Sequence, residues 1–205
     1  MLVPSMTFAE IRKEIEKDFP ILYRKMGYKT KDLKKEYYKK IKKNEYVGFF
    51  DYTSKYKNHW IYWISITKNK SFYGAMLLYH NGKKRSAIGV TYELNIIYHT
   101  GHFFDRFNER LKLGFHSFNE IVQYYLAMNN VYQFQELDEI EPDNVYTMFC
   151  IIPSGVILGM YNRNLNLLKA NTFITNDMMY KEQRDLREYL RNLFDNYKSN
   201  SAVLD

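Results

Sequence analysis

The densest group of side chains able to do chemistry is the run His99-Thr-Gly-His-Phe-Phe-Asp-Arg-Phe-Asn-Glu-Arg-Leu111. On a helix, at about 100° per residue, its polar face carries His102, Arg106, Glu109 and Arg110. Thr100 is a candidate N-cap, which places His102 in the first turn. The positive end of the helix dipole disfavours an imidazolium there, so His102 can accept a proton. The two arginines, with the free amides of the helix start, can hold a phosphate or another oxyanion.

Two other interpretations of this run stay open. In the first, the arginines pair with Asp105 and Glu109 on an exposed helix face, and His102 is an ordinary surface residue. In the second, His99, His102 and His116 supply three imidazoles to a metal. No nearby cysteine or suitably spaced carboxylate completes a zinc pattern, so we expect neither a metal nor a cofactor. Lone Cys150 lies in an apolar segment and is expected to be a buried structural thiol.

Helices are expected at the amino terminus of the chain. Thr7-Phe-Ala-Glu10 has the form of a capping box, which begins a helix. Pro20 and Gly27 are expected to interrupt it. Thr30 then caps a second helix, in which apolar residues recur at intervals of four and lysines occupy the other faces. Residues 1–44 are thus predicted to be a basic helical extension.

From residue 46 the periodicity changes to segments rich in Tyr, Ile, Trp and Val, which are typical of strands. Strands are predicted at 46–52, 60–67, 72–80 and 85–92. The dipeptide Asn81-Gly82, between the last two, favours a tight hairpin turn. In the strand that contains Trp60 and Ile61, adjacent side chains point to opposite faces of the sheet. The side chains on at least one of these two faces are expected in the core.

The second half of the chain is predicted to contain two helices, three strands and a terminal helix. The helices cover about 101–113 and, after the capping box Ser117-Phe-Asn-Glu120, a segment to about 130. An acidic connection at 135–143 leads to strands at 145–152, 156–161 and 167–174. The terminal helix follows Asn176 and should bury one face that contains Met179, Leu186, Leu190 and Leu193.

These elements predict a single α+β domain over residues 1–205, with an antiparallel sheet flanked by helices and an N-terminal helical extension. Its parts are the helical basic extension at 1–44, a β-rich part at 45–98, and a helix-helix-three strands-helix part at 99–197.

Residues 99 to about 185 resemble the metal-independent nuclease superfamily that includes barnase, EndoU, colicin-type and RelE-like toxins. The resemblance rests on "HFFDRFNERL", then a helix, an acidic connection, sheet segments with "SGVILG" and "NTFIT", and a final helix. Many members in phages and mobile elements carry the motif His-x3-Arg-x2-Glu-Arg, which matches His102, Arg106, Glu109 and Arg110 here. Such families often place a hydroxyl residue on the late strand, where Thr172 or Thr175 falls.

The resemblance implies RNA cleavage without a metal, by attack of the ribose 2′-hydroxyl on the adjacent phosphate. This chemistry needs a base, an acid for the leaving oxygen, and positive charge on the phosphoryl oxygens. His102 would be the base or the acid, and Arg106 and Arg110 would clamp the phosphate. Further contributors from the sheet would be Thr172, Arg163 and Lys169.

Positive charge is concentrated in the first half of the chain. The chain has 30 Lys and Arg against 23 Asp and Glu, a net charge of +7, whereas its first 100 residues have 20 against 9, a net charge of +11. This asymmetry favours an anionic partner, of which RNA is preferred. The candidate phosphate contacts are Lys35, Lys39, Lys83, Lys84, Arg85, Arg163 and Lys169. With no apolar run long enough for a membrane helix and no signal core, we expect a cytoplasmic protein that does not engage a membrane.

The predicted function is therefore that of a toxin-like, metal-independent ribonuclease encoded by a phage or mobile element. Two alternatives stay open. One is a non-catalytic module of the same fold that binds nucleic acid or protein, including an inhibitory or assembly partner. The other is a structural protein that associates with itself.

Overall fold

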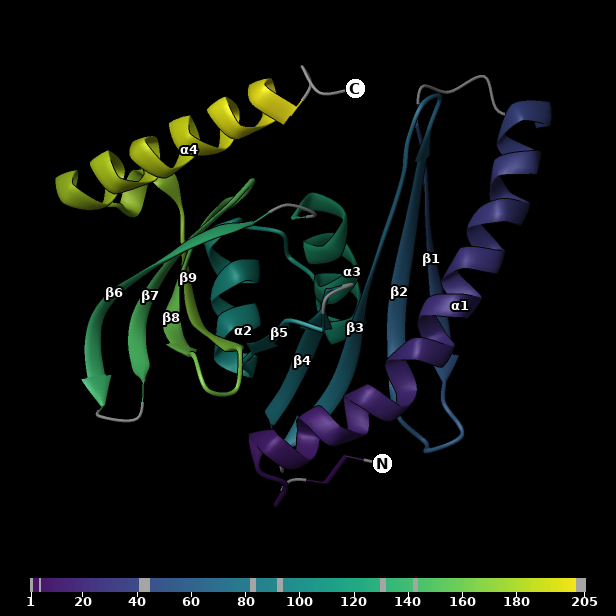
Figure 1. Ribbon diagram of the computed structural model, residues 1–205, viewed down its shortest axis with the longest axis horizontal. Coiled ribbons are helices and arrows are strands. Elements are labelled where there is room, and N and C mark those ends of the chain that lie inside the picture. Colours follow the sequence, from purple (N-terminus) through teal and green to yellow (C-terminus); the bar gives the residue numbers. More distant parts are fainter. Residues whose placement is uncertain are drawn as a thin grey trace.

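The computed structural model describes residues 2–3, 5–40, 45–81, 84–91, 94–129, 132–141 and 144–201. These residues form the predicted α+β fold, in which helices pack on both faces of a nine-stranded sheet (Figure 1). The helices are α1 (Phe8–Lys40), α2 (Gly101–Arg110), α3 (Phe118–Met128) and α4 (Lys181–Ser201), with a short 3-10 turn at Asn176–Met178. The strands are β1 (Glu45–Thr53), β2 (His59–Thr67), β3 (Ser71–Asn81), β4 (Lys84–Val90), β5 (Ile96–His99), β6 (Gln133–Glu141), β7 (Val145–Ile152), β8 (Gly155–Asn162) and β9 (Leu167–Ile174).

The strands lie in the order β1-β2-β3-β4-β5-β9-β8-β7-β6. Each neighbouring pair is antiparallel except β5 and β9, which run parallel and join the two halves of the sheet. The prediction of an antiparallel sheet is thus right for most of it and wrong at this junction. The short strand β5 was not predicted, because four residues before a helix give too little periodicity to detect.

Helices cover both faces of the sheet, so both faces of the central strands are buried. α1 packs against one face of β2–β5, where Trp60 and Ile64 lie, whereas α2 and α3 pack against the opposite face, where Ile61 and Trp63 lie. In the C-terminal half, α2 and α3 again cover one face and α4 the other. Figure 1 shows α2 and α3 between the two halves of the sheet. The side chains on both faces of β2 therefore belong to the core, whereas the sequence predicted this for at least one face.

The first helix is one continuous element, and the prediction of two helices divided at Pro20 and Gly27 is wrong. Buried Ile15, Phe19, Leu22 and Met26 continue the helical spacing through the proline. Burying these side chains against the sheet offsets the cost of about 3 kcal/mol that an internal proline carries. The axis of α1 bends in Figure 1, as expected of a helix that contains proline.

Thr30 does not cap a second helix. Its hydroxyl donates to the Met26 carbonyl 2.8 Å away, inside α1. At the start of α1, by contrast, the predicted capping box is present: the Glu10 amide donates to the Thr7 hydroxyl, and the Thr7 amide donates to the Glu10 carboxylate. The capping pattern thus predicted the start of α1 correctly, because no tertiary contact competes with it there.

The acidic segment predicted as a connection is instead mostly strand β6, which pairs with β7 at the edge of the sheet. Its pairing with β7 shifts register twice, and carboxylates such as Asp138 and Glu139 are exposed. Charges and irregular pairing are usual on edge strands, because they discourage pairing with another chain. A prediction based on composition missed this strand, because a segment with so many charged residues is not typical of a strand.

The remaining elements agree with prediction to within a few residues. The β3–β4 hairpin forms as expected, although Gly82 and Lys83 lie outside the described residues. On α4, Leu190 is buried, whereas Leu193 stays 43% exposed, contrary to expectation. Across the described part of the chain, no helix is both long enough and apolar enough to cross a membrane.

Candidate functional site

The helix that carries the predicted motif is held by its N-cap and by three buried phenylalanines. The Thr100 hydroxyl accepts from the Phe103 amide at 3.1 Å, which confirms the predicted cap, and it lies 3.3 Å from the Ala170 carbonyl on β9. Phe103, Phe104 and Phe107 have no exposed surface. The apolar side of α2 is therefore fixed against the sheet, and His102 is left on the exposed side.

Gly101 allows the first turn of α2 to touch strand β4. A Cβ atom on this residue would lie 2.5 Å from the carbonyl oxygen of Arg85, closer than any ordinary contact. Only glycine permits this approach without displacing the strand. The contact brings His102, the next residue, to the start of β4, where Lys84 and Arg85 line the same hollow.

A second imidazole reaches the same place through the turn that follows α2. Lys112 and Gly114 both have positive φ, of 53° and 68°, and reverse the chain after the helix. The Asn108 amide group then donates to the Phe115 carbonyl at 2.9 Å and accepts from the Phe115 amide at 3.2 Å. These two bonds tie the turn to α2 and place His116 near its first turn.

Together these segments form a surface hollow of about 430 Å³, here called the basic hollow. It is lined by Lys84, Arg85, Gly101, His102, Asp105, Asn108, Phe115, His116, Phe118 and Ile121. Its lining includes two cationic residues, two histidines and one acidic residue, Asp105. The described lining thus carries more positive than negative charge, and histidine is the residue most often used in general acid–base catalysis.

The two arginines predicted to clamp a phosphate are engaged elsewhere. The Arg106 guanidinium lies 2.7 Å from the Glu109 carboxylate, and Arg110 donates to the Phe173 carbonyl at the end of β9. Neither lines the basic hollow. The arrangement of Arg106 matches the alternative interpretation, in which charged residues of an exposed helix pair with one another.

Thr172 lies on the side of the sheet away from α2. It pairs with Leu158, and both the Leu158 and Ile174 side chains pack with the α4 cluster, whereas Phe173 packs with α2. The cause is a register shift between β8 and β9, which leaves Asn171 without a partner in register and reverses the alternation after it. The structure therefore does not bring Thr172 to His102, and the sequence carries no clear signal of such a bulge.

The other predicted phosphate contacts are scattered. Lys35 is exposed on α1, 3.7 Å from Asp32, and Lys169 neighbours Tyr98, which faces α1. Arg163 forms an ion pair with Glu136 and lies 4.4 Å over the Tyr146 ring. The Lys39 side chain and all of Lys83 lie outside the described part of the structure. Of the five predicted contacts whose side chains are described, Lys84 and Arg85 line the basic hollow and the other three do not.

The third histidine of the metal hypothesis is separate from the other two. His99 is buried, and its Nε2 lies 2.9 Å from the Tyr125 hydroxyl. Burial lowers the pKa of His99 to about 3, so the ring is neutral. Within the described residues, no three His, Cys, Asp or Glu side chains are grouped to hold a metal ion. Cys150 is buried as predicted, and burial raises the pKa of its thiol to about 12.

Sequence reasoning considered His116 only as a metal ligand and missed it as a partner of His102. The available signals were Gly101 at the helix start and Gly114 in the turn, but neither indicates which segments come together. In comparisons with known proteins, no family model, curated protein or solved structure matches this chain.

Proposed function

We propose that the basic hollow binds the phosphate backbone of RNA and cleaves it without a metal. The observation that carries the proposal is the meeting of His102 and His116 with Lys84 and Arg85, which come from three separate segments. Cleavage through the 2′-hydroxyl needs one group to take a proton and another to give one. Two histidines beside two cationic residues supply the required groups.

In this mechanism, one imidazole removes the proton from the 2′-hydroxyl and the other protonates the departing 5′-oxygen. Lys84 and Arg85 balance the charge that develops on the phosphoryl oxygens. Asp105 is the carboxylate available to orient an imidazole and select its tautomer. The assignment keeps His102 from the predicted motif but replaces Arg106, Arg110 and Thr172 with His116 and the two cations of β4.

The decisive experiment incubates single-stranded RNA with the protein in EDTA and analyses the ends of the products. We expect 2′,3′-cyclic phosphate ends, and a rate reduced by about 100-fold or more in each of His102→Ala and His116→Ala. His59→Ala is the matched control, because His59 is exposed, bonds Asp51 on β1 and does not line the basic hollow. Equal rates in all three variants would remove both histidines from the reaction.

A second candidate function is RNA binding without cleavage, and the engaged state of Arg106 and Arg110 favours it. Without these guanidiniums, fewer groups are available to stabilise a transition state. This alternative predicts steeply salt-dependent binding to RNA with no product. Lys84→Ala or Arg85→Ala should each reduce the salt slope by about one counterion. Binding that does not change with salt would contradict both candidates.

The toxin-like role, an origin in a phage or mobile element, and an inhibitory protein partner belong to the same proposal. The resemblance of residues 99 to about 185 to metal-independent nucleases supports them. Expression of the wild-type chain, but not of His102→Ala, should arrest growth of a bacterial host if the role is that of a toxin.

A further inference from the structure

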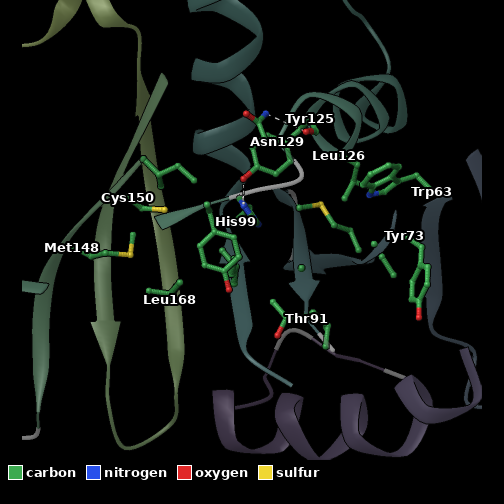
Figure 2. Close-up of a pocket in the computed structure, with 18 residues that line it drawn as sticks. Trp63, Tyr73, Thr91, His99, Tyr125, Leu126, Asn129, Met148, Cys150 and Leu168 are labelled. Atoms are coloured by element: carbon green, nitrogen blue, oxygen red, sulfur yellow. Dashed lines mark hydrogen bonds between the residues drawn. The ribbon is translucent and has the colours of Figure 1, made fainter. Parts of the chain in front are cut away.

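A second cavity, which is half open to the surface, lies away from the basic hollow. It has a volume of about 150 Å³ and lies between the sheet and the C-terminal part of α3 (Figure 2). Strands β2 to β5 and β7 to β9 contribute to its wall, with Trp63, Met76, Met148, Ile157 and Leu168 among the apolar side chains. An apolar cavity of about this volume is large enough to hold benzene.

The described residues that line this cavity include no Asp, Glu, Lys or Arg. Three lining groups have strongly shifted pKa values, and all three are neutral at physiological pH. Burial lowers the pKa of His99 and raises the pKa values of Tyr125 and Cys150. A charged ligand would lose its hydration without gaining an opposite charge. The cavity therefore selects uncharged molecules.

Most polar groups of the wall already have partners within the protein. The Asn129 side-chain oxygen accepts from the amide and hydroxyl of Ser154 at 3.1 and 2.7 Å, and its nitrogen donates to the Tyr125 carbonyl. Tyr73 donates its hydroxyl proton to Tyr23. His99 differs: among the described residues no group forms a hydrogen bond of ordinary geometry with its buried Nδ1 atom, although nearby backbone groups of Ile97 and Ala87 act to raise the pKa of the ring.

The bond between His99 and Tyr125 determines what could satisfy this nitrogen. A neutral imidazole has one N–H and one acceptor nitrogen. If the Tyr125 hydroxyl donates to Nε2, then Nδ1 carries the proton and needs an acceptor; if Nε2 donates to Tyr125, then Nδ1 needs a donor. A hydroxyl group meets either need, because it both donates and accepts.

We propose that the cavity binds a small, uncharged, single-ring molecule whose hydroxyl group hydrogen bonds to His99 Nδ1. The phenol class has this size and chemistry. The ring of the ligand lies among the apolar side chains, and its hydroxyl bonds to the buried Nδ1 atom, for which the described residues supply no hydrogen bond of ordinary geometry. The His99 ring is held in position by Phe103, Phe104 and Tyr125, whose ring centroids lie 4.9–5.6 Å from its own.

The test titrates the full chain with phenol, benzene and benzoate in a calorimeter. We expect phenol to bind, benzene to bind up to about tenfold more weakly because it lacks the hydrogen bond, and benzoate to give no binding. His99→Phe keeps a ring but removes Nδ1, so phenol should lose its advantage over benzene.

Gly89→Ala provides a variant that tests the place of the ligand while keeping the His99 ring. The added methyl group would enter the cavity with Met76 and His99 carbon atoms 3.5 and 3.6 Å away, so it fits without a clash. Loss of that space should weaken phenol binding by about tenfold or more. Gly27→Ala on α1, where nothing lies within 4 Å, is the matched control and should bind phenol as the wild type does.

Failure of phenol to bind the folded wild-type chain at millimolar concentration would overturn the proposal and indicate a cavity filled only by water. Equal binding of phenol by Gly89→Ala and Gly27→Ala would place the ligand elsewhere, and would also overturn it. Because RNA cleavage is measured separately, neither result bears on the basic hollow.

Discussion

Gly101→Ala tests whether the close approach of α2 and β4 builds the basic hollow. The new Cβ atom would lie 2.5 Å from the Arg85 carbonyl oxygen, about 0.9 Å short of the 3.4 Å at which ordinary contact begins. The obstacle is backbone on a paired strand, which cannot rotate away as a side chain could. Overpacking of this kind costs about 1–3 kcal/mol of unfolding free energy.

Replacing glycine with alanine also stiffens the unfolded chain, which recovers about 0.4–1 kcal/mol at any site that accepts the side chain. The net expectation for Gly101→Ala is therefore a loss of about 1–2 kcal/mol. Gly27→Ala, with open space around it and a helical backbone, should instead gain about 0.5–1 kcal/mol. The two variants should differ by about 1.5–3 kcal/mol.

Urea unfolding followed by far-ultraviolet circular dichroism measures this difference. The midpoint of Gly101→Ala should lie below that of Gly27→Ala by about 0.5–1.5 M, with similar slopes. If the basic hollow binds RNA as proposed, binding should fall only in Gly101→Ala, because the methyl group pushes the first turn of α2, with His102, away from β4. A Gly101→Ala midpoint equal to or above that of Gly27→Ala would refute the inference that the helix and strand are in contact.

Three further predictions concern the elements around the two cavities. The pKa of His99 falls from 6.5 to about 3 on folding, so the unfolded state binds more protons than the folded state between these two pH values. The free energy of unfolding should therefore fall as the pH drops through this range, by up to about 1.4 kcal/mol per pH unit. Denaturant titrations of His99→Phe should lack this component, and equal slopes in both proteins would contradict the burial. Arg106→Ala should change the unfolding free energy by at most about 0.5 kcal/mol, because its partner Glu109 is exposed. Arg110→Ala should cost about 1 kcal/mol or more, because it loses the hydrogen bond to the Phe173 carbonyl. A larger loss in Arg106→Ala than in Arg110→Ala, measured by thermal unfolding, would contradict this assignment of the two arginines. Thr100→Ala should cost about 1–2 kcal/mol by removing the N-cap of α2, and unchanged stability would mean that Phe103 finds another acceptor.

The sequence determined the local elements well wherever a short-range signal controlled them. The Thr7 capping box, the Thr100 cap of α2 and the alternation along β2 were all predicted, because each depends on neighbours within four residues. The same reasoning failed at Pro20, where long-range packing keeps the helix continuous, and in β6, where pairing with β7 gives an acidic segment a strand conformation.

For the candidate site, the sequence alone identified His102 and placed it on an exposed helix face. Only the tertiary structure decided its neighbours. The parallel pairing of β5 with β9, the contact of Gly101 with Arg85 and the bulge at Asn171 join residues far apart in the chain. They place Arg110 against a backbone carbonyl and Thr172 on the opposite face, while the turn tied by Asn108 to Phe115 brings His116 to the hollow that His102 lines. Spacing in a sequence reports which residues share a face of one element, whereas a site is made where faces of several elements meet.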